Sequence, residues 1–84
     1  MTSRVLHQGQ VTIILNFIGG SIEVGPIEGS LENVLPGIYA TLRYKEPLPT
    51  GATHVVVKFD GKEMAGEVTF QADNELTFSQ KDCW

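Results

Sequence analysis

The chain has 84 residues and one cysteine, so it is expected to form one domain over residues 1–84 without an internal disulfide. Six Lys and Arg against ten Asp and Glu leave a net charge of −4, which disfavours nucleic acid and anionic membranes as partners. No run approaches the roughly 20 apolar residues of a membrane span, and residues 1–10 lack the apolar segment of a signal peptide. The cytoplasm is therefore the expected compartment.

The most apolar run of the chain is Val11–Ile18, which predicts a β-strand. One face of this strand is wholly apolar and is formed by Val11, Ile13, Leu15 and Phe17. Ile14 and Ile18 make the opposite face partly apolar, which is typical of a central strand or of a strand covered by a partner. A short edge strand over Arg4–Gln8 is expected to precede it.

The next segment is divided by glycines and prolines. Gly19-Gly20 is expected to form a turn, after which the chain returns with Ile22 and Val24 facing inward. Ser30–Leu35 has its apolar residues at one-turn helical spacing behind a serine cap, and Pro36-Gly37 follows at once. This segment predicts at most one turn of helix.

Ile38–Lys45 predicts a strand with strict alternation. Its apolar face consists of Ile38, Ala40, Leu42 and Tyr44, and Tyr39 lies on the other face. The following segment, 46–51, contains two prolines, which cannot donate to a ladder of hydrogen bonds. We expect it to cross from one sheet to another.

The strongest structural signal is the stretch 54–78, in which apolar and polar residues alternate on both sides of Asp60-Gly61. This dipeptide favours a two-residue hairpin turn. The turn would place Lys58 opposite Glu63 and His54 opposite Glu67, so that cation faces anion. A slip of one residue would put apolar side chains on the charged face, so the register is expected to be firmly held.

A second hairpin is expected around residues 73–75. A two-residue loop would split the aromatic residues between the two faces, whereas a three-residue loop pairs Phe70 with Phe78 and Ala72 with Leu76. The three-residue loop is therefore preferred, with Asn74 or Glu75 in a left-handed conformation, and Asn74 is favoured because it tolerates positive φ better.

Six or seven short strands with frequent turn signals predict an all-β fold. The preferred architecture is a single small antiparallel β-sandwich, and the alternative is a small SH3-like or other β-barrel. The segment Val34–Leu42 resembles the "leucine, proline, glycine, any residue, tyrosine" start of a strand in transthyretin-like sandwiches, including the B-type repeats of bacterial collagen adhesins. Those repeats often carry an isopeptide bond seeded by an early lysine, but this chain has none before Lys45. The resemblance implies a sandwich and no function.

No pattern in the sequence indicates catalysis. His7, His54 and Cys83 are far apart and match no metal-ligand spacing, so no metal and no cofactor are expected. A catalytic Cys83–histidine pair would need a thiol in fixed geometry one residue from the chain end. The carboxylates fall at alternate or turn positions that solvent would claim: Glu23, Glu28, Glu32, Glu63 and Glu67. The protein is therefore not expected to be an enzyme.

Apolar and aromatic residues on outward faces are the main functional clue, because a contiguous apolar patch marks an interface. The candidate interface consists of Ile14, Ile18, Tyr39, Val56, Ala65 and Trp84. The preferred hypothesis is a non-enzymatic protein-interaction or structural module that acts through a sheet face or edge strand, on a protein partner or a second copy. An inhibitor, an immunity protein or an assembly subunit, including one encoded by a phage or mobile element, fits this class. The alternative is a carbohydrate- or ligand-binding module that uses Tyr39, Tyr44 or Trp84 as stacking surfaces.

Overall fold

The computed structural model describes residues 4–35 and 39–80, and in this part of the chain it contains six β-strands and no helix. The first two strands are much longer than the rest, and all neighbouring strands are antiparallel. The strands are β1 (Arg4–Phe17), β2 (Gly20–Leu35), β3 (Tyr39–Tyr44), β4 (His54–Phe59), β5 (Lys62–Ala72) and β6 (Glu75–Gln80).

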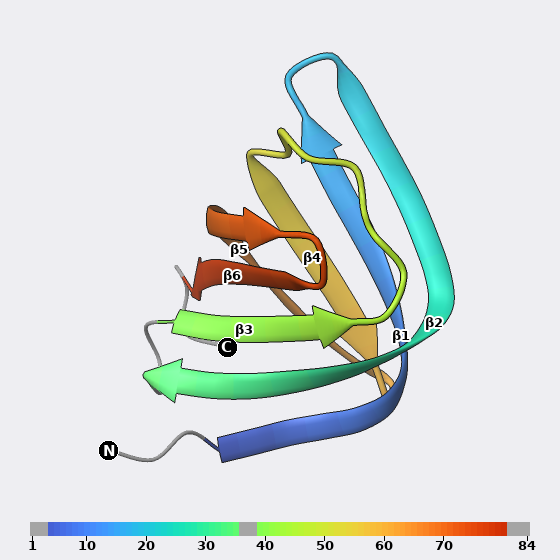
Figure 1. Cartoon of the computed structure of the whole chain (residues 1–84), viewed down its shortest axis with the longest axis vertical. Coiled ribbons are helices and arrows are strands. Elements are labelled where there is room, and N and C mark those ends of the chain that lie inside the picture. Colours follow the sequence, from blue (N-terminus) through green and yellow to red (C-terminus); the bar gives the residue numbers. More distant parts are fainter. Residues whose placement is uncertain (1–3, 36–38, 81–84) are drawn as a thin grey trace.

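The six strands close into a barrel in the order β1-β2-β3-β6-β5-β4, with β4 returning to β1 (Figure 1). Closure depends on the two long strands, which bend and take part in more than one pairing. β1 pairs with β2 along its length and with β4 through Thr12–Asn16, while the far half of β2, Gly29–Leu35, pairs with β3. The all-β class and the strand number are confirmed. Of the two architectures that the sequence allowed, the chain adopts the barrel, because β1–β4 and β3–β6 pairing joins the two halves into one sheet.

The core is formed largely by the residues that the alternation placed inward in β1, β3, β4 and β6, whereas Phe70 of β5, also predicted to face inward, is 52% exposed beyond a register shift. Phe78 is the largest of the fully buried side chains, and burial of such a residue contributes roughly 1.5–3 kcal/mol. The β3–β4 loop, which contains the two prolines, does not join two sheets but adds buried Leu48 to the core of the barrel. The least exposed core residues are Val11, Ile13, Leu15, Leu31, Ala40, Leu42, Val55, Val57, Leu76 and Phe78.

The N-terminal half differs from expectation at several points. Arg4–Gln8 is not a separate edge strand but the start of β1, and the first turn lies at Ile18-Gly19, one residue earlier than predicted. β2 continues through the cis Gly25-Pro26 peptide, because a register shift against β1 accommodates the extra length there. Ile22 was expected to face inward, but it is 45% exposed.

The predicted helical turn over Ser30–Leu35 is wrong. This segment is extended and pairs with β1 on one side and with β3 on the other. Leu31 lies opposite Leu42 in β3, and both side chains are fully buried. Two neighbouring strands satisfy the backbone groups of this segment, and that tertiary pairing overrides the local helical spacing.

The β4–β5 hairpin has the predicted turn and register. Asp60 and Gly61 form the turn with φ of 50° and 73°, and the pairs Lys58–Glu63 and His54–Glu67 are as expected. Both turn residues have positive φ, as a type I′ turn requires. This hairpin is therefore specified locally.

The β5–β6 hairpin has a shorter turn than predicted. The loop is the two residues Asp73-Asn74, so Phe70 pairs with Thr77 and not with Phe78. A register shift between Val68 and Phe70 then brings Val68 opposite Phe78. The apolar pairing is thus restored by a bulge inside the strand and not by a longer loop.

Asn74 also does not have the predicted left-handed conformation, since Asp60 is the positive-φ residue among the described non-glycine residues. The Asn74 side-chain amide instead donates to the backbone oxygens of Tyr44, at 3.0 Å, and Lys45, at 2.8 Å. These bonds fasten the β5–β6 turn to the end of β3.

Candidate interaction surfaces

Three of the predicted interface residues form one row across the outer face of the barrel. Ile14 in β1 is the register partner of Val56 in β4, and Val56 is the partner of Ala65 in β5. Directly opposite side chains on one face of a sheet lie roughly 4.5–5.5 Å apart at Cβ. All three side chains are half-buried, which makes this row a small apolar strip.

Polar rows border this strip on both sides. Thr12, Lys58 and Glu63 lie in the row on one side, and Asn16, His54 and Glu67 lie in the row on the other. His54 thus faces Glu67 as predicted, and its Nδ1 lies 3.0 Å from the hydroxyl of Thr53. The apolar strip is therefore one residue wide along the strands.

The remaining predicted interface residues are not part of the strip. Tyr39 begins β3 and pairs with Ser79 of β6, on another part of the barrel wall. Ile18 is at the tip of the β1–β2 hairpin, where its side chain is 97% exposed. Trp84 lies outside the described residues. The structure thus brings together three of the six residues and separates two others.

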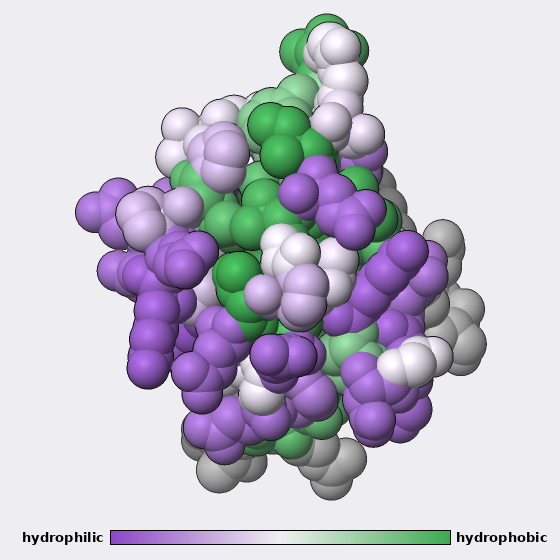
Figure 2. All heavy atoms as spheres, turned by 90° about the vertical axis from the view of Figure 1, so that its right-hand side faces the viewer, coloured by the Kyte–Doolittle hydropathy of each residue, from purple (hydrophilic) through white to green (hydrophobic). Residues whose placement is uncertain are grey.

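The end of the β1–β2 hairpin, residues 18–23, is exposed at every position and extends past the last β1–β4 pair, Asn16–His54, and we refer to it as the arm (Figure 1). The protein measures 35 Å along its longest axis and 24 Å along the other two, and the arm lies at one end of the long axis. Ile18 and Ile22 are its exposed large apolar residues. Figure 2 faces the side where β1 and β2 lie, and it shows apolar surface descending from the tip between hydrophilic side chains.

Sequence reasoning identified Ile18 but missed Ile22 and the arm itself. One signal was present, because no residue from Val11 to Ile22 is charged. Alternation of apolar and polar residues predicted that Ile22 faces inward. In the structure Ile22 does lie opposite the fully buried Leu15, but it is itself exposed. Whether an inward-phased residue is covered depends on whether the barrel extends that far.

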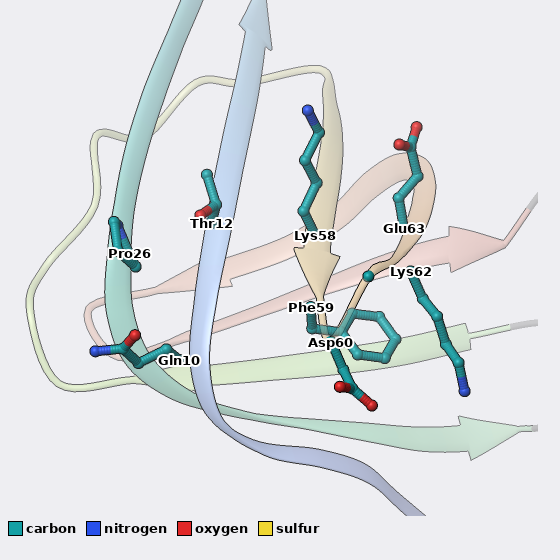
Figure 3. A pocket seen from close by; sticks show the side chains of 9 residues that line it. Gln10, Thr12, Pro26, Lys58, Phe59, Asp60, Lys62 and Glu63 are labelled. Atoms are coloured by element: carbon teal, nitrogen blue, oxygen red, sulfur yellow. The ribbon is translucent and has the colours of Figure 1, made fainter.

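A hollow with a volume of about 510 Å³ lies on the surface beside the β4–β5 turn (Figure 3). Both signs of charge line it. Lys58 and Glu63 point to one side, whereas Asp60 and Lys62 point to the other, so an amine and a carboxylate share each direction. Such a mixed lining produces no strong field of one sign for a charged ligand.

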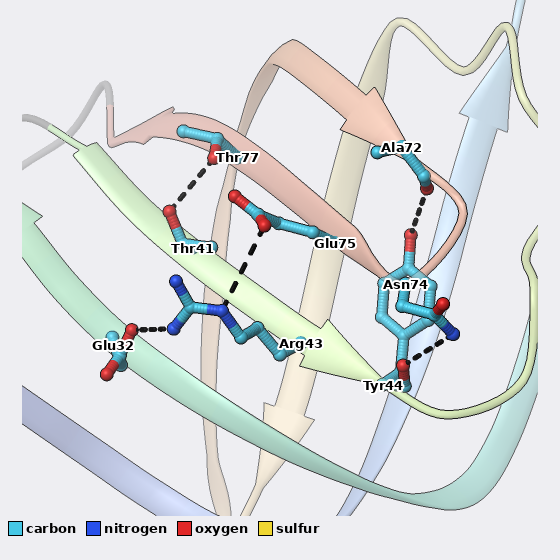
Figure 4. Close-up of polar contacts among 8 residues, drawn as sticks. All are labelled: Glu32, Thr41, Arg43, Tyr44, Ala72, Asn74, Glu75 and Thr77. Carbon is cyan, nitrogen blue, oxygen red and sulfur yellow. Dashed lines mark hydrogen bonds and ion pairs between the residues drawn. The ribbon is translucent and has the colours of Figure 1, made fainter.

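Polar contacts cross-link β2, β3 and β6 on the barrel wall (Figure 4). The Arg43 guanidinium forms an ion pair with Glu32 of β2, and its Nε lies 4.0 Å from the carboxylate of Glu75 in β6. The hydroxyls of Thr41 and Thr77 lie 2.9 Å apart, two residues along β3 and β6 from the Arg43–Glu75 pair. These contacts account for polar side chains on the outer wall without invoking a ligand.

Tyr44 is buried and cannot serve as the exposed stacking surface that the carbohydrate hypothesis requires. Its side chain points into the barrel, and its hydroxyl donates to the backbone oxygen of Ala72 at 3.4 Å. Burial is the main cause that raises the pKa of this hydroxyl, and the nearby Asp73 and Glu75 carboxylates add to it. Tyr44 is thus a core residue with a polar end.

The structure does not bring the histidines together. His7 lies at the opposite end of β1 from the pairing with His54, and its ring is tilted against Phe59 at a centroid distance of 5.2 Å. Within residues 4–35 and 39–80, no three His, Cys, Asp or Glu side chains are placed to share a metal ion. Cys83 lies outside these residues. The same residues include no helix that is long and apolar enough to cross a membrane.

No protein-family model, curated protein or solved structure matches the chain.

Proposed function

We propose that this protein is a non-enzymatic protein-interaction module that docks through the arm. The observation that supports this most directly is the 97% exposure of Ile18 at the tip of a projecting hairpin. Removing an isoleucine side chain from water is worth roughly 1.5–3 kcal/mol, and a partner with an apolar groove would supply that burial.

The construction of the arm also supports a docking role. The two strands that carry it are held in continuous register from the Ile13–Val24 pair to the Phe17–Gly20 pair. A preformed hairpin loses little conformational entropy on binding, which favours affinity. Its uncharged tip can enter a partner without the desolvation penalty of a buried charge. An assembly subunit, an inhibitor or an immunity protein would each use the arm in this way.

Site-specific photocrosslinking in the source cell tests the proposal. A benzophenone amino acid replaces Ile18 in one variant and Phe70 in a matched control, because Phe70 is an exposed apolar residue of β5 outside the arm. The Ile18 probe should yield adducts of discrete mass, to another protein or to a second copy. Excess unlabelled wild-type protein should compete these adducts away, whereas excess Ile18→Asp protein should not.

Equal labelling from positions 18 and 70, or competition by the Ile18→Asp protein, would refute docking through the arm.

A further inference from the structure

One edge of β2 is left without a neighbouring strand. β1 covers one side of β2, while β3 begins to pair on the other side only at Gly29. Among the described residues, no backbone hydrogen bond reaches this second side between Gly20 and Glu28. Unpaired strand edges attract further strands, and natural proteins usually block them with charges, prolines or bulges. Here Pro26, which has no N–H, limits the usable edge to the five residues Gly20–Val24.

The neighbouring strand shows which backbone groups point out of this edge. The backbone oxygen of Asn16 accepts a hydrogen bond from the Thr53 N–H at 2.8 Å, so this oxygen points towards β4 and away from β2. Ser21 is the partner of Asn16 and therefore belongs to a non-hydrogen-bonded pair. In such a pair, the N–H and C=O of Ser21 point away from β1. Alternation along the strand gives Glu23 the same orientation.

Building on the proposed function, we propose that this edge pairs with the same edge of a second copy, antiparallel and around a two-fold axis at Ile22. Each Ile22 then lies directly opposite Ile22 of the second copy, and each Ser21 lies opposite the other Glu23. The N–H and C=O groups that leave the edge belong to Ser21 and Glu23, so this register satisfies all of them in four mutual hydrogen bonds. Isologous contacts of this kind are typical of protein dimers.

Side-chain chemistry selects this register among the alternatives. Ile22 and Val24 lie on one face of β2, and Ser21 and Glu23 lie on the other. Shifting the pairing by one residue would put Ile22 opposite Glu23 and mix the two faces. Shifting it by two in one direction would put Glu23 opposite Glu23, which is unfavourable for like charges. Shifting it by two in the other direction would put Ser21 opposite Ser21 and Glu23 opposite the turn residue Gly19, so that Glu23 would lose its strand partner. The register centred on Ile22 instead joins two apolar faces, and it places a neutral serine opposite each glutamate.

The occupant is therefore a second copy, because the edge complements itself in both backbone groups and side chains. A different protein would need no such symmetry. The exposed Ile22, which the barrel leaves uncovered, becomes the centre of the contact.

Sedimentation equilibrium over a concentration series tests this pairing. The wild type should show a reversible monomer–dimer equilibrium below roughly 1 mM, the weak end of specific association. Ile22→Asp and Ile22→Lys should each raise the dissociation constant at least about tenfold, because like charges then face each other at the axis. An equimolar mixture of the two variants should restore dimers, since Asp then faces Lys. Phe70→Asp and Phe70→Lys are the matched controls and should dimerise as the wild type does.

Circular dichroism and thermal melting of each variant establish that the fold is retained, since position 22 is already exposed to water. A wild type that stays monomeric up to roughly 1 mM, or a mixture that fails to restore dimers, would overturn the pairing. Either result leaves the crosslinking test at Ile18 intact, because the arm can dock on a different protein without strand pairing. Failure of the dimer and failure of docking through the arm are thus separate outcomes.

Discussion

Replacing Gly66 by alanine tests the close approach of β5 and β6 on which barrel closure depends. Gly66 is buried and pairs with Gln80, next to the Glu67–Ser79 pair. A Cβ atom at this position would overlap the backbone oxygen of Ser79 and lie 2.8 Å from its carbonyl carbon. Because the obstacle is backbone and not a flexible side chain, the strand β6 itself must move.

The cost follows from what that movement disrupts. Overpacking a tight site costs roughly 1–3 kcal/mol, and each ladder hydrogen bond that is lost or distorted adds about 1 kcal/mol. With one or two such bonds lost, Gly66→Ala should lower the free energy of unfolding by about 2–5 kcal/mol. A domain of this size has roughly 4–12 kcal/mol in total, so the variant should be near the limit of folding.

Urea denaturation followed by circular dichroism measures this loss, with two glycines as controls. Gly61→Ala meets no atom within 4 Å but places a side chain at φ +73°, which should cost about 1–2 kcal/mol. Gly19→Ala also meets open space, without a left-handed backbone, and should change stability by less than about 0.5 kcal/mol. If Gly66→Ala loses no more stability than Gly61→Ala, the strands are not as close as described and the reasoning fails.

Two further predictions concern the end of the barrel at the β5–β6 turn. Because the pKa of Tyr44 is raised above 10.0, the folded protein keeps a proton that the unfolded chain loses, so stability should fall as pH rises above about 10. Tyr44→Phe should diminish that alkaline loss, and urea titrations at neutral and alkaline pH would show no difference between the two proteins if the hydroxyl were solvated. Asn74→Ala should cost about 1–2 kcal/mol through its two bonds to backbone oxygens. Asp73→Ala, the adjacent turn residue, serves as control, and equal losses in the two thermal melts would contradict the fastening role of Asn74.

The candidate surfaces show where sequence reasoning succeeds and where it stops. Alternation placed Ile14, Val56 and Ala65 on outward faces, and they do lie in one row. Their adjacency depends on β1–β4 pairing, whose partners are about forty residues apart in the chain, and no local pattern encodes that pairing. Ile22 shows the opposite case: the alternation of the sequence predicts that its side chain faces the core, but the barrel does not extend far enough to cover it.

The sequence by itself determined the all-β class, the inward face of Val11–Phe17 and of strands β3, β4 and β6, and the complete register of the β4–β5 hairpin. These properties depend on a side-chain period of two and on a turn dipeptide that accepts positive φ, both of which act over a few residues. Only the tertiary structure decided between sandwich and barrel and made Ser30–Leu35 a strand. It also decided that the apolar residues of β5 and β6 are paired through a bulge within β5 and not through a three-residue loop. The same alternation serves a sandwich and a barrel equally well. The choice rests on how two long, bent strands share their backbone hydrogen bonds with partners far away in the chain.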